Sequence, residues 1–284
     1  MIKVLSVPLG EDLTEFTQIL WRYEVPHRVV ELEHSQEIWV AAGVEPAQIV
    51  ALYEKCRRGE SLEGFVLAIP RAVGQANLLS QVKQAWISGL LIASSVLLTF
   101  LISFGDNLEW LRLFTIADIV QKDGGLYSSG LEGTLQSFEI WRLITPIFLH
   151  FSELHIAFNA LWIWIVGSRI EIYQGRVTLC LLILFSGVIS NIAQYHDAGP
   201  MFGGLSGVVF AFLGYAWLWD KTQSAHRIGL PQSIMGFLIF WLVLGYAGVL
   251  EALQLGAIAN TAHLVGLLAG LAFIPFGKLL VTRR

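Results

Sequence analysis

Charged residues are scarce in this chain. Only 14% of its 284 residues are Asp, Glu, Lys or Arg, whereas 55% are hydrophobic. Soluble globular proteins contain about 25% charged residues, so this chain has too few polar side chains to cover its apolar surface in water. The mean hydropathy of +0.63 and the ten Trp residues favour an integral membrane protein with interfacial anchors. The net charge of -4 points to no nucleic-acid partner.

Cysteine is also rare. Cys56 follows a polar helical stretch and Cys180 lies in an apolar run, and neither has the Cys/His spacing of a zinc site. We therefore expect no metal ion and no cofactor. The N-terminal stretch MIKVLSVPLGED has too short an apolar core for a secretory signal peptide, so we expect the first spanning helix to direct membrane insertion.

The first sixty residues are typical of a small soluble domain. MIKVLSVP, HRVVELEHS and EIWVAA predict strands, and GEDLTEFTQILWRYEV and PAQIVALYEKCRRG predict helices, with Pro46 in a first turn and Gly59 as a stop. The order βαββα predicts a small cytoplasmic α/β domain at residues 1–60, followed by a linker at 61–84. The role of this domain stays open, because a tether or a stability element explains it as well as a binding function does.

Six apolar runs follow and predict an all-α membrane domain at residues 85–284. They are Trp86–Phe104, Pro146–Gly167, Val177–Tyr195, Leu205–Trp219, Ser233–Leu250 and Thr261–Leu280. Most approach the ~20 residues that an α-helix needs to span a bilayer. The fourth run is shorter, so we expect its helix to begin below the membrane surface, shielded by its neighbours.

The positions of Lys and Arg predict the orientation. Basic residues flank the ends that we assign to the cytoplasm, from Lys83 before the first run to Lys278 in the tail, whereas HDAGPMFGG and residues 251–260 have none. Both termini are therefore predicted to be cytoplasmic. The first connection, residues 105–145, departs from this alternation. Its stretch NLEWLRLFTIADIV is amphipathic and aromatic, which favours a segment lying in the membrane interface; a solvated loop with one helical turn is the alternative.

Polar residues recur near the outer ends of three runs, where a polar side chain is costly and is a candidate for function. His150, His155 and Asn159 lie in the second run, Ser206 opens the fourth and His263 opens the sixth. These three runs all lead from the outside inward. With a rise of about 1.5 Å per residue, the five side chains share one depth in the membrane, which is the first requirement for a site.

Each of these residues also has a purely structural interpretation. Ser206 lies within a small-xxx-small packing pattern, Gly203 to Gly207, and His263 precedes another, Gly266 to Gly270. The His and Asn of the second run, four residues apart on one helical face, suit interhelical hydrogen bonds, and the first His of that run suits the membrane interface or a structural role.

Together the residues have the composition of a serine hydrolase site. A serine hydroxyl needs a base to become a nucleophile, and His263 is the candidate base. The glycine patterns would let the two helices approach closely and bring Ser206 to His263. His155, Asn159 and the backbone N–H of Ser206 can donate to a developing oxyanion. Because no acidic residue lies at this depth in the six runs, the sequence predicts a Ser–His dyad.

These motifs resemble the rhomboid family of intramembrane serine proteases, most closely its bacterial GlpG type. The matching residues are Trp141-Arg142 for a WR pair, His150, His155 and Asn159 for H-x-x-x-x-H-x-x-x-N, Gly204, Ser206 and Gly207 for G-x-S-G, and Ala262, His263, Gly266 and Gly270 for A-H-x-x-G-x-x-x-G. The resemblance covers about residues 85–280, and the N-terminal domain resembles the small cytoplasmic domain of this type.

The resemblance implies a role for each site residue. Ser206 would attack the peptide carbonyl, and His263 would act first as base and then as acid. His155, Asn159 and the Ser206 N–H would form the oxyanion hole. Supporting roles would fall to His150, Gly204, Phe210, Gly266, Trp141 and Arg142. Phe210 stands where the family usually has Tyr, so we expect its ring to stack on the histidine without a hydroxyl hydrogen bond.

The resemblance also implies partners and a location. The protein would lie in the bilayer of a bacterial inner membrane, with its site open to the periplasmic side, and would cut transmembrane segments of membrane-protein substrates. The first outer loop would lie in the outer leaflet as an aromatic wedge. Substrates would enter laterally from the membrane, past a gate formed by the fifth span and the loop before the sixth. Since a substrate helix must unwind before attack, we expect small or helix-breaking residues near the cleavage site.

Two other functions stay open at this point. Polar residues within the membrane and broken helices also occur in transporters and channels, although the site contains no ionised pair lining a route. A catalytically silent protein of the same architecture, which binds membrane helices, is the second alternative. Labelling with a serine-reactive fluorophosphonate separates these functions from a protease.

Overall fold

The computed structural model describes residues 2–23, 25–40, 44–62, 65, 67, 78–223, 226–231, 233–252 and 258–281. The chain divides into two compact units, Met1–Asn77 and Leu78–Arg284. The segment predicted as a linker, residues 61–84, lies partly outside the described residues, and its last part is helical.

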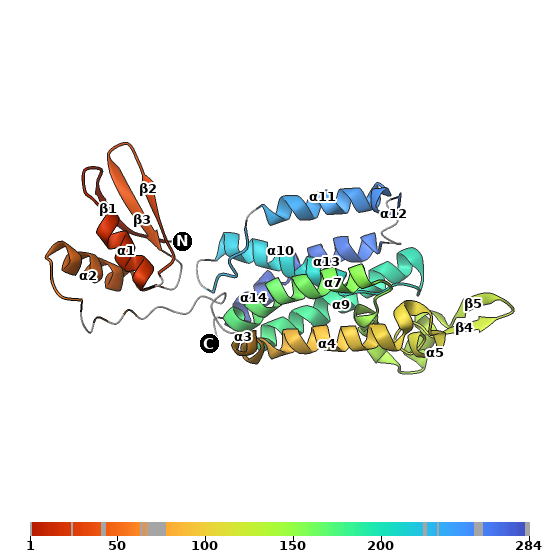
Figure 1. Cartoon of the computed structure of the whole chain (residues 1–284). Helices are drawn as coiled ribbons and strands as arrows, with labels where there is room; N and C mark the ends of the chain where they lie inside the picture. The colour runs from red at the N-terminus through yellow and green to blue at the C-terminus, as the bar shows by residue number, and fades with distance from the viewer. Residues whose placement is uncertain are drawn as a thin grey trace. The chain divides into compact units, whose positions relative to one another are not determined.

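The first unit is a small α/β fold. Its elements are β1 (Ile2–Pro8), α1 (Thr14–Arg22), β2 (His27–Glu31), β3 (Ser35–Val40) and α2 (Pro46–Arg57). The strands form an antiparallel sheet in the order β1-β3-β2 (Figure 1). In the central strand β3, Gln36, Ile38 and Val40 are buried and alternate with less buried residues, as the two-residue period of a strand requires. The predicted small α/β class of this region is confirmed.

The two helices of this unit cover its sheet with apolar faces. Leu20 of α1 and Ile49 of α2 are fully buried with Ile38 of the sheet, and each such side chain stabilises the fold by about 1.5–3 kcal/mol. Pro46 is the first residue of α2, where its missing N–H has no helical acceptor to lose. Gly59, at φ 66°, follows the end of α2 in the left-handed conformation that commonly stops a helix.

The second unit is mostly helical. Its elements are α3 (Leu78–Gln84), α4 (Trp86–Leu101), α5 (Leu108–Leu111), β4 (Ile119–Lys122), β5 (Gly125–Ser128), α6 (Gly130–Gln136), α7 (Glu153–Trp162), α8 (Ser168–Gln174), α9 (Arg176–Ala198), α10 (Ser206–Thr222), α11 (Ile234–Tyr246), α12 (Val249–Ala252), α13 (Asn260–Ala272) and α14 (Ile274–Val281). A π-helical turn, Ile163–Gly167, joins α7 to α8. The long helices run along a common direction, and α9, α10 and α13 pack against one another (Figure 1).

The apolar helices differ in length. By length and composition, α9 alone is able to cross a membrane among the helices described, and α13 with α14 passes the same criteria as a pair bent by 44°. Pro275 lies in the first turn of α14; because it has no N–H for Leu271, it explains the bend. The helices α4 and α11 are apolar but shorter. The mostly helical class is confirmed, and the count of six spans stays a prediction.

The start of the second predicted span is corrected by the structure. Helix α7 begins at Glu153, not at Pro146, which lies in a 3-10 turn. Ser152 caps α7, since its Oγ accepts a hydrogen bond from the backbone N of His155 at 3.2 Å, as serine commonly does at a helix start. His150 therefore precedes the helix instead of lying in it.

The outer connection is also different from the expected amphipathic segment. Of residues 107–120, only α5 is helical, and the chain then forms the hairpin β4–β5. Lys122 pairs with Gly125, which leaves a two-residue turn of Asp123 and Gly124 at φ 51° and 76°. Two positive φ angles define a type I′ hairpin turn, for which Asp-Gly is a favoured sequence. The local structure is thus a loop with one helical turn and a hairpin, and the location of this segment in the membrane interface stays a prediction.

Helices α10 and α13 touch through their backbones. A Cβ atom added at Gly266 would lie 2.1 Å from the carbonyl oxygen of Gly207, and one added at Gly270 would lie 2.0 Å from that of Ala211. The Gly266-xxx-Gly270 pattern therefore lies on the contact, as expected, and only glycine fits there.

The other glycine pattern is not a helical stripe. Gly203 precedes α10, and a Cβ atom there would meet Leu149 Cβ at 2.5 Å. Gly207 lies inside α10, and a Cβ atom there would meet Ser190 Oγ of α9 at 2.7 Å. Because the two glycines contact different segments, the predicted Gly203-xxx-Gly207 packing pattern is wrong.

The connection from α10 to α11 is anchored by a buried carboxylate. Asp220, near the end of α10, is 6% exposed and accepts hydrogen bonds from the backbone N atoms of Ile228, Gly229 and Leu230 at 2.6, 2.7 and 3.0 Å. Arg169 of α8 donates to the carbonyl of Gly229 at 3.0 Å. These bonds hold the segment that leads into α11.

Candidate active site

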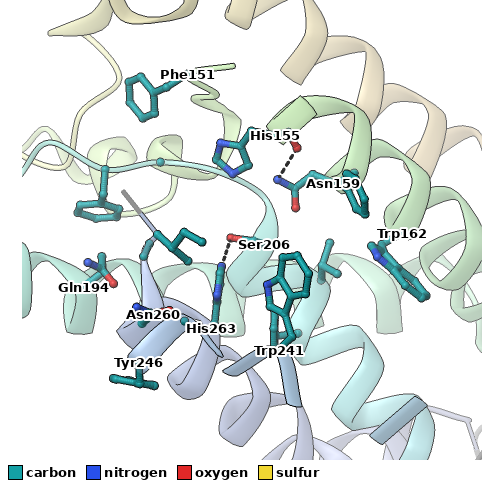
Figure 2. A pocket seen from close by; sticks show the side chains of 18 of the residues that line it. Phe151, His155, Asn159, Trp162, Gln194, Ser206, Trp241, Tyr246, Asn260 and His263 are labelled. Atoms are coloured by element: carbon teal, nitrogen blue, oxygen red, sulfur yellow. Dashed lines mark hydrogen bonds between the residues drawn. The ribbon is translucent and has the colours of Figure 1, made fainter. Parts of the chain in front are cut away.

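A cavity of about 1050 Å³ lies among α7, α9, α10, α11 and α13. Ser206, His263, His155 and Asn159 all line it (Figure 2). The structure therefore brings together side chains from three of the predicted apolar runs, the second, the fourth and the sixth.

Ser206 and His263 are in direct contact. Ser206 is the first residue of α10, and His263 lies in the first turn of α13. The Oγ atom of Ser206 lies 2.7 Å from Nε2 of His263, so the hydroxyl donates when this nitrogen is unprotonated. Nδ1 of His263 is buried, and no group in the described part of the chain bonds to it. The arrangement is that of a dyad.

Phe210 holds the histidine ring from one side. It lies one turn after Ser206, and its ring stacks on that of His263 with centroids 4.6 Å apart and planes 7° apart. An aromatic pair of this kind contributes about 0.5–1.5 kcal/mol beyond its buried area. The expected stacking is thus present, and it restricts the imidazole in the absence of a carboxylate partner.

Three hydrogen-bond donors surround the backbone just before Ser206. Gly204 has φ 123°, and a Cβ atom there would lie 2.6 Å from His155 Nε2 and 3.7 Å from Asn159 Nδ2. Both side chains therefore face this loop, and Gly204 is required by both its conformation and its contacts. Asn159 Nδ2 donates one hydrogen to the carbonyl of His155 at 3.1 Å and keeps a second. The N–H of Ser206, in the first turn of α10, has no helical acceptor and lies at the positive end of the helix dipole.

His150 supports this loop from the other side. It is fully buried, which agrees with its structural interpretation and not with an interfacial one. Leu205 N donates to His150 Nε2 at 3.3 Å, which leaves Nδ1 to donate to the carbonyl of Phe148 at 3.2 Å. The ring also packs edge-on against that of His155, with centroids 4.8 Å apart. His150 thus fixes the residue that precedes Ser206.

Trp141 and Arg142 lie elsewhere, since neither lines the cavity. Arg142 is 3% exposed and donates to Glu139 Oε2 at 2.6 Å and to the carbonyls of Arg112 and Thr115 at 2.5 and 3.2 Å. It therefore organises the outer connection, while Trp141 is half exposed.

A second ion pair in this connection joins Arg112 to Asp118. The two side chains are bidentate, at 3.0 and 2.8 Å. The Arg112 hydrogen bond holds the pKa of the Asp118 carboxyl below its ordinary value, and partial burial opposes the shift. Both residues contribute to loop structure and neither lines the cavity.

Two residues that the sequence analysis did not single out hold the start of α13. Gln194 Oε1 accepts a hydrogen bond from Ala262 N at 2.9 Å, and Asp197 Oδ2 accepts one from Thr261 Oγ1 at 2.8 Å. Both lie on α9, which runs to Ala198 instead of ending at Tyr195. The sequence signal for Gln194 and Asp197 is a series of polar residues three or four positions apart on an otherwise apolar helix.

Among the described residues, no group of three or more His, Cys, Asp or Glu side chains is arranged to hold a metal ion.

Comparison with known proteins gives matches over both units. The Rhomboid domain matches residues 137–278, and the Rhomboid N-terminal domain matches residues 1–64. The rhomboid protease GlpG of Yersinia pseudotuberculosis serotype I (strain IP32953) is 43% identical over 136 residues, which is 48% of this chain and 48% of that protein. The rhomboid protease GlpG of Photorhabdus laumondii subsp. laumondii is 43% identical over 136 residues, 48% of this chain and 47% of that protein. The chain spans about half the length of the curated relatives it matches.

Proposed function

The chain belongs to the rhomboid family, and on that premise we propose that it is an intramembrane serine endopeptidase that cleaves transmembrane helices of other membrane proteins. The observation that carries the proposal is the 2.7 Å contact between Ser206 Oγ and His263 Nε2 in a cavity lined by polar donors. The relatives named rhomboid protease GlpG support the same activity.

The proposed reaction uses Ser206 as nucleophile and His263 as its base. The Oγ atom attacks the carbonyl carbon of the scissile peptide bond while its proton passes to Nε2. The C–N bond then breaks, and Nε2 returns this proton to the leaving amine, which leaves an acyl-enzyme. A water molecule attacks the ester, His263 again accepts a proton, and the acid product is released with Ser206 restored.

The oxyanion formed in each step needs donors that are already in place. We assign this role to the N–H of Ser206, the free hydrogen of Asn159 Nδ2 and a ring N–H of His155. The support is that both side chains face Gly204, two residues before the nucleophile. A hydrogen bond that forms fully only in the transition state accelerates the chemical step rather than binding alone.

The proposed setting is the bacterial inner membrane. We assign the six spans to α4, α7 with α8, α9, α10, α11, and α13 with α14, with both termini cytoplasmic and the cavity open to the periplasm. Outward side chains such as Leu97 and Phe100 of α4, which are 71% and 65% exposed, suit lipid. We propose that the cavity admits the water that hydrolysis needs. Such water, together with the surrounding protein, would also satisfy the irregular backbone at residues 203–205, which is tolerated at membrane depth only beside water or protein.

We propose that substrates enter beside α11. This helix has few buried residues among those described, namely Leu238, Leu242 and Gly245, and Trp241 from the same helix lines the cavity (Figure 2). A loosely packed helix beside a site is suited to move as a gate. Part of the loop before α13, which the sequence analysis included in the gate, lies outside the described residues.

The test is labelling with a fluorophosphonate probe together with cleavage of a transmembrane substrate. We expect Ser206→Ala and His263→Ala to lose both signals. His196→Ala is the matched control, because this histidine is exposed on α9 and does not line the cavity. An unmutated protein that is folded but takes no label would favour a silent helix-binding protein or a transporter instead.

A further inference from the structure

The cavity has one acidic side chain on its wall. Asp197, in the last turn of α9, lines the cavity, and no Lys or Arg side chain does so among the residues that the structure describes. Apart from the histidines, Asp197 is therefore the one side chain on the described wall that carries a formal charge at neutral pH, and its charge is negative. Asp197 is exposed, so its carboxylate is accessible to a molecule in the cavity.

The carboxylate is fixed relative to the reacting atoms. Asp197 Oδ2 accepts a hydrogen bond from Thr261 Oγ1 at 2.8 Å, and Thr261 lies two residues before His263 on α13. One turn earlier on α9, Gln194 accepts a hydrogen bond from Ala262 N at 2.9 Å. The end of α9 is thus joined to the start of the helix that carries the base. A carboxylate keeps further acceptor positions after one such bond.

The rest of the wall is largely apolar, with Phe151, Phe158, Met201 and Trp241 among its residues. The Asp197 carboxylate itself is exposed, so salt screens its charge, which acts mainly within about a Debye length, ~10 Å at 0.1 M salt. A fixed carboxylate attracts a cation and repels an anion in the same place, so it discriminates in both directions.

We propose that Asp197 is a specificity-determining residue, which makes the cavity favour substrates that carry Lys or Arg near the scissile bond over substrates that carry Asp or Glu there. The proposal rests on the proposed proteolytic function. It concerns the substrate class of that site: transmembrane segments with a basic side chain in the stretch that leads from the scissile bond to the cavity rim at the end of α9.

The alternative to this proposal is a purely structural role, in which Asp197 positions α13 through its hydrogen bond with Thr261. Two variants separate the roles. Asp197→Asn keeps an acceptor for Thr261 and removes the charge. Thr261→Val removes the hydrogen bond and keeps the charge. A structural role predicts that Thr261→Val slows the cleavage of every substrate and that Asp197→Asn, which keeps the acceptor, changes little. A specificity role predicts a changed substrate ratio in Asp197→Asn and an unchanged ratio in Thr261→Val.

The experiment uses the full chain in liposomes and one transmembrane substrate made with Lys, Gln or Glu at each of the three positions on either side of the scissile bond. For at least one position we expect kcat/KM to be about three- to tenfold higher with Lys than with Glu, given the modest strength of exposed ion pairs. We expect this ratio to fall below about twofold in Asp197→Asn, to persist in Thr261→Val, and to shrink as salt is raised from 50 to 500 mM.

The outcomes against the proposal are distinct from failure of the proposed function. Equal cleavage of the Lys and Glu substrates at all positions, or a ratio that is the same in Asp197→Asn as in the unmutated protein, overturns the charge preference and leaves proteolysis intact. Absence of cleavage of the neutral Gln substrates, on which Asp197 has no charge to act, overturns the proteolytic function itself.

Discussion

The contact between α10 and α13 gives the sharpest prediction, which is the effect of Gly266→Ala. The added Cβ atom would lie 2.1 Å from the carbonyl oxygen of Gly207, whereas non-bonded heavy atoms need roughly 3.5 Å. The helices must then separate by about 1 Å near Ser206 and His263. The Oγ–Nε2 distance of 2.7 Å would grow to a value at which no hydrogen bond remains.

The loss of rate follows from this displacement. A misplacement of about 1 Å at a reacting centre costs on the order of 10²-fold in rate, and forcing a methyl group into a packed interface costs about 1–3 kcal/mol of stability. We therefore expect Gly266→Ala to slow fluorophosphonate labelling of Ser206 about 100-fold, measured at a temperature below the midpoint of its thermal unfolding. We expect Gly270→Ala, whose Cβ atom would lie 2.0 Å from the carbonyl of Ala211, to be similarly destabilised.

The matched control is Gly236→Ala in α11, where nothing lies within 4 Å of the added atom. Alanine there improves the helix propensity by about 1 kcal/mol, so stability and labelling should be kept or slightly raised. If folded Gly266→Ala labels within threefold of the unmutated protein, then the backbone contact does not set the position of the dyad and the reasoning is refuted.

Three further predictions concern residues outside that contact. Phe210→Ala should slow labelling about three- to tenfold by freeing the His263 ring, while Phe210→Tyr should keep it; equal rates for both variants would remove the stacking argument. The pKa of Asp118 is lowered in the folded protein by Arg112, so this group contributes stability above its unfolded pKa that is lost as pH falls through the lower folded value. Asp118→Asn should therefore flatten the decline of the unfolding temperature below about pH 4, by under about 1 kcal/mol because the pair is partly exposed; an unchanged slope would contradict this. Asp220→Ala leaves three backbone N–H groups without their acceptor and should cost about 2–4 kcal/mol in chemical unfolding, with labelling at low temperature retained, and a change within 0.5 kcal/mol would show that water replaces the carboxylate.

Much of the fold was accessible from the sequence because local signals agreed with the final structure. The short β-rich runs and the helix signals Pro46 and Gly59 located the elements of the first unit. In the second unit, the glycine pattern around Gly266 indicated a close helix contact, and polar residues at one depth indicated which side chains would meet.

The rest depended on contacts that no local pattern encodes. His150 lies in a loop, where its ring bonds to the backbone of Phe148 and of Leu205. Leu205 is 55 residues away in sequence, so no local pattern predicts this contact. The hairpin has a local signal in Asp123-Gly124, whereas the aromatic residues at helical spacing before it predict a longer helix than the one turn of α5. The third apolar run ends at Tyr195, so composition alone predicts no helix at Asp197, whereas the α9 backbone continues to Ala198.

The backbone contact between α10 and α13 also limits how the protein can tolerate change. The atom that obstructs a side chain at position 266 is a carbonyl oxygen, and every amino acid has one, so no replacement at Gly207 can make room. Gly277 is different, because the atoms that a Cβ there would meet belong to the side chain of Tyr215. A smaller residue at 215 can compensate for an enlarged residue at 277. A search for second-site suppressors should therefore recover reciprocal pairs for Gly277, and none on α10 for Gly266.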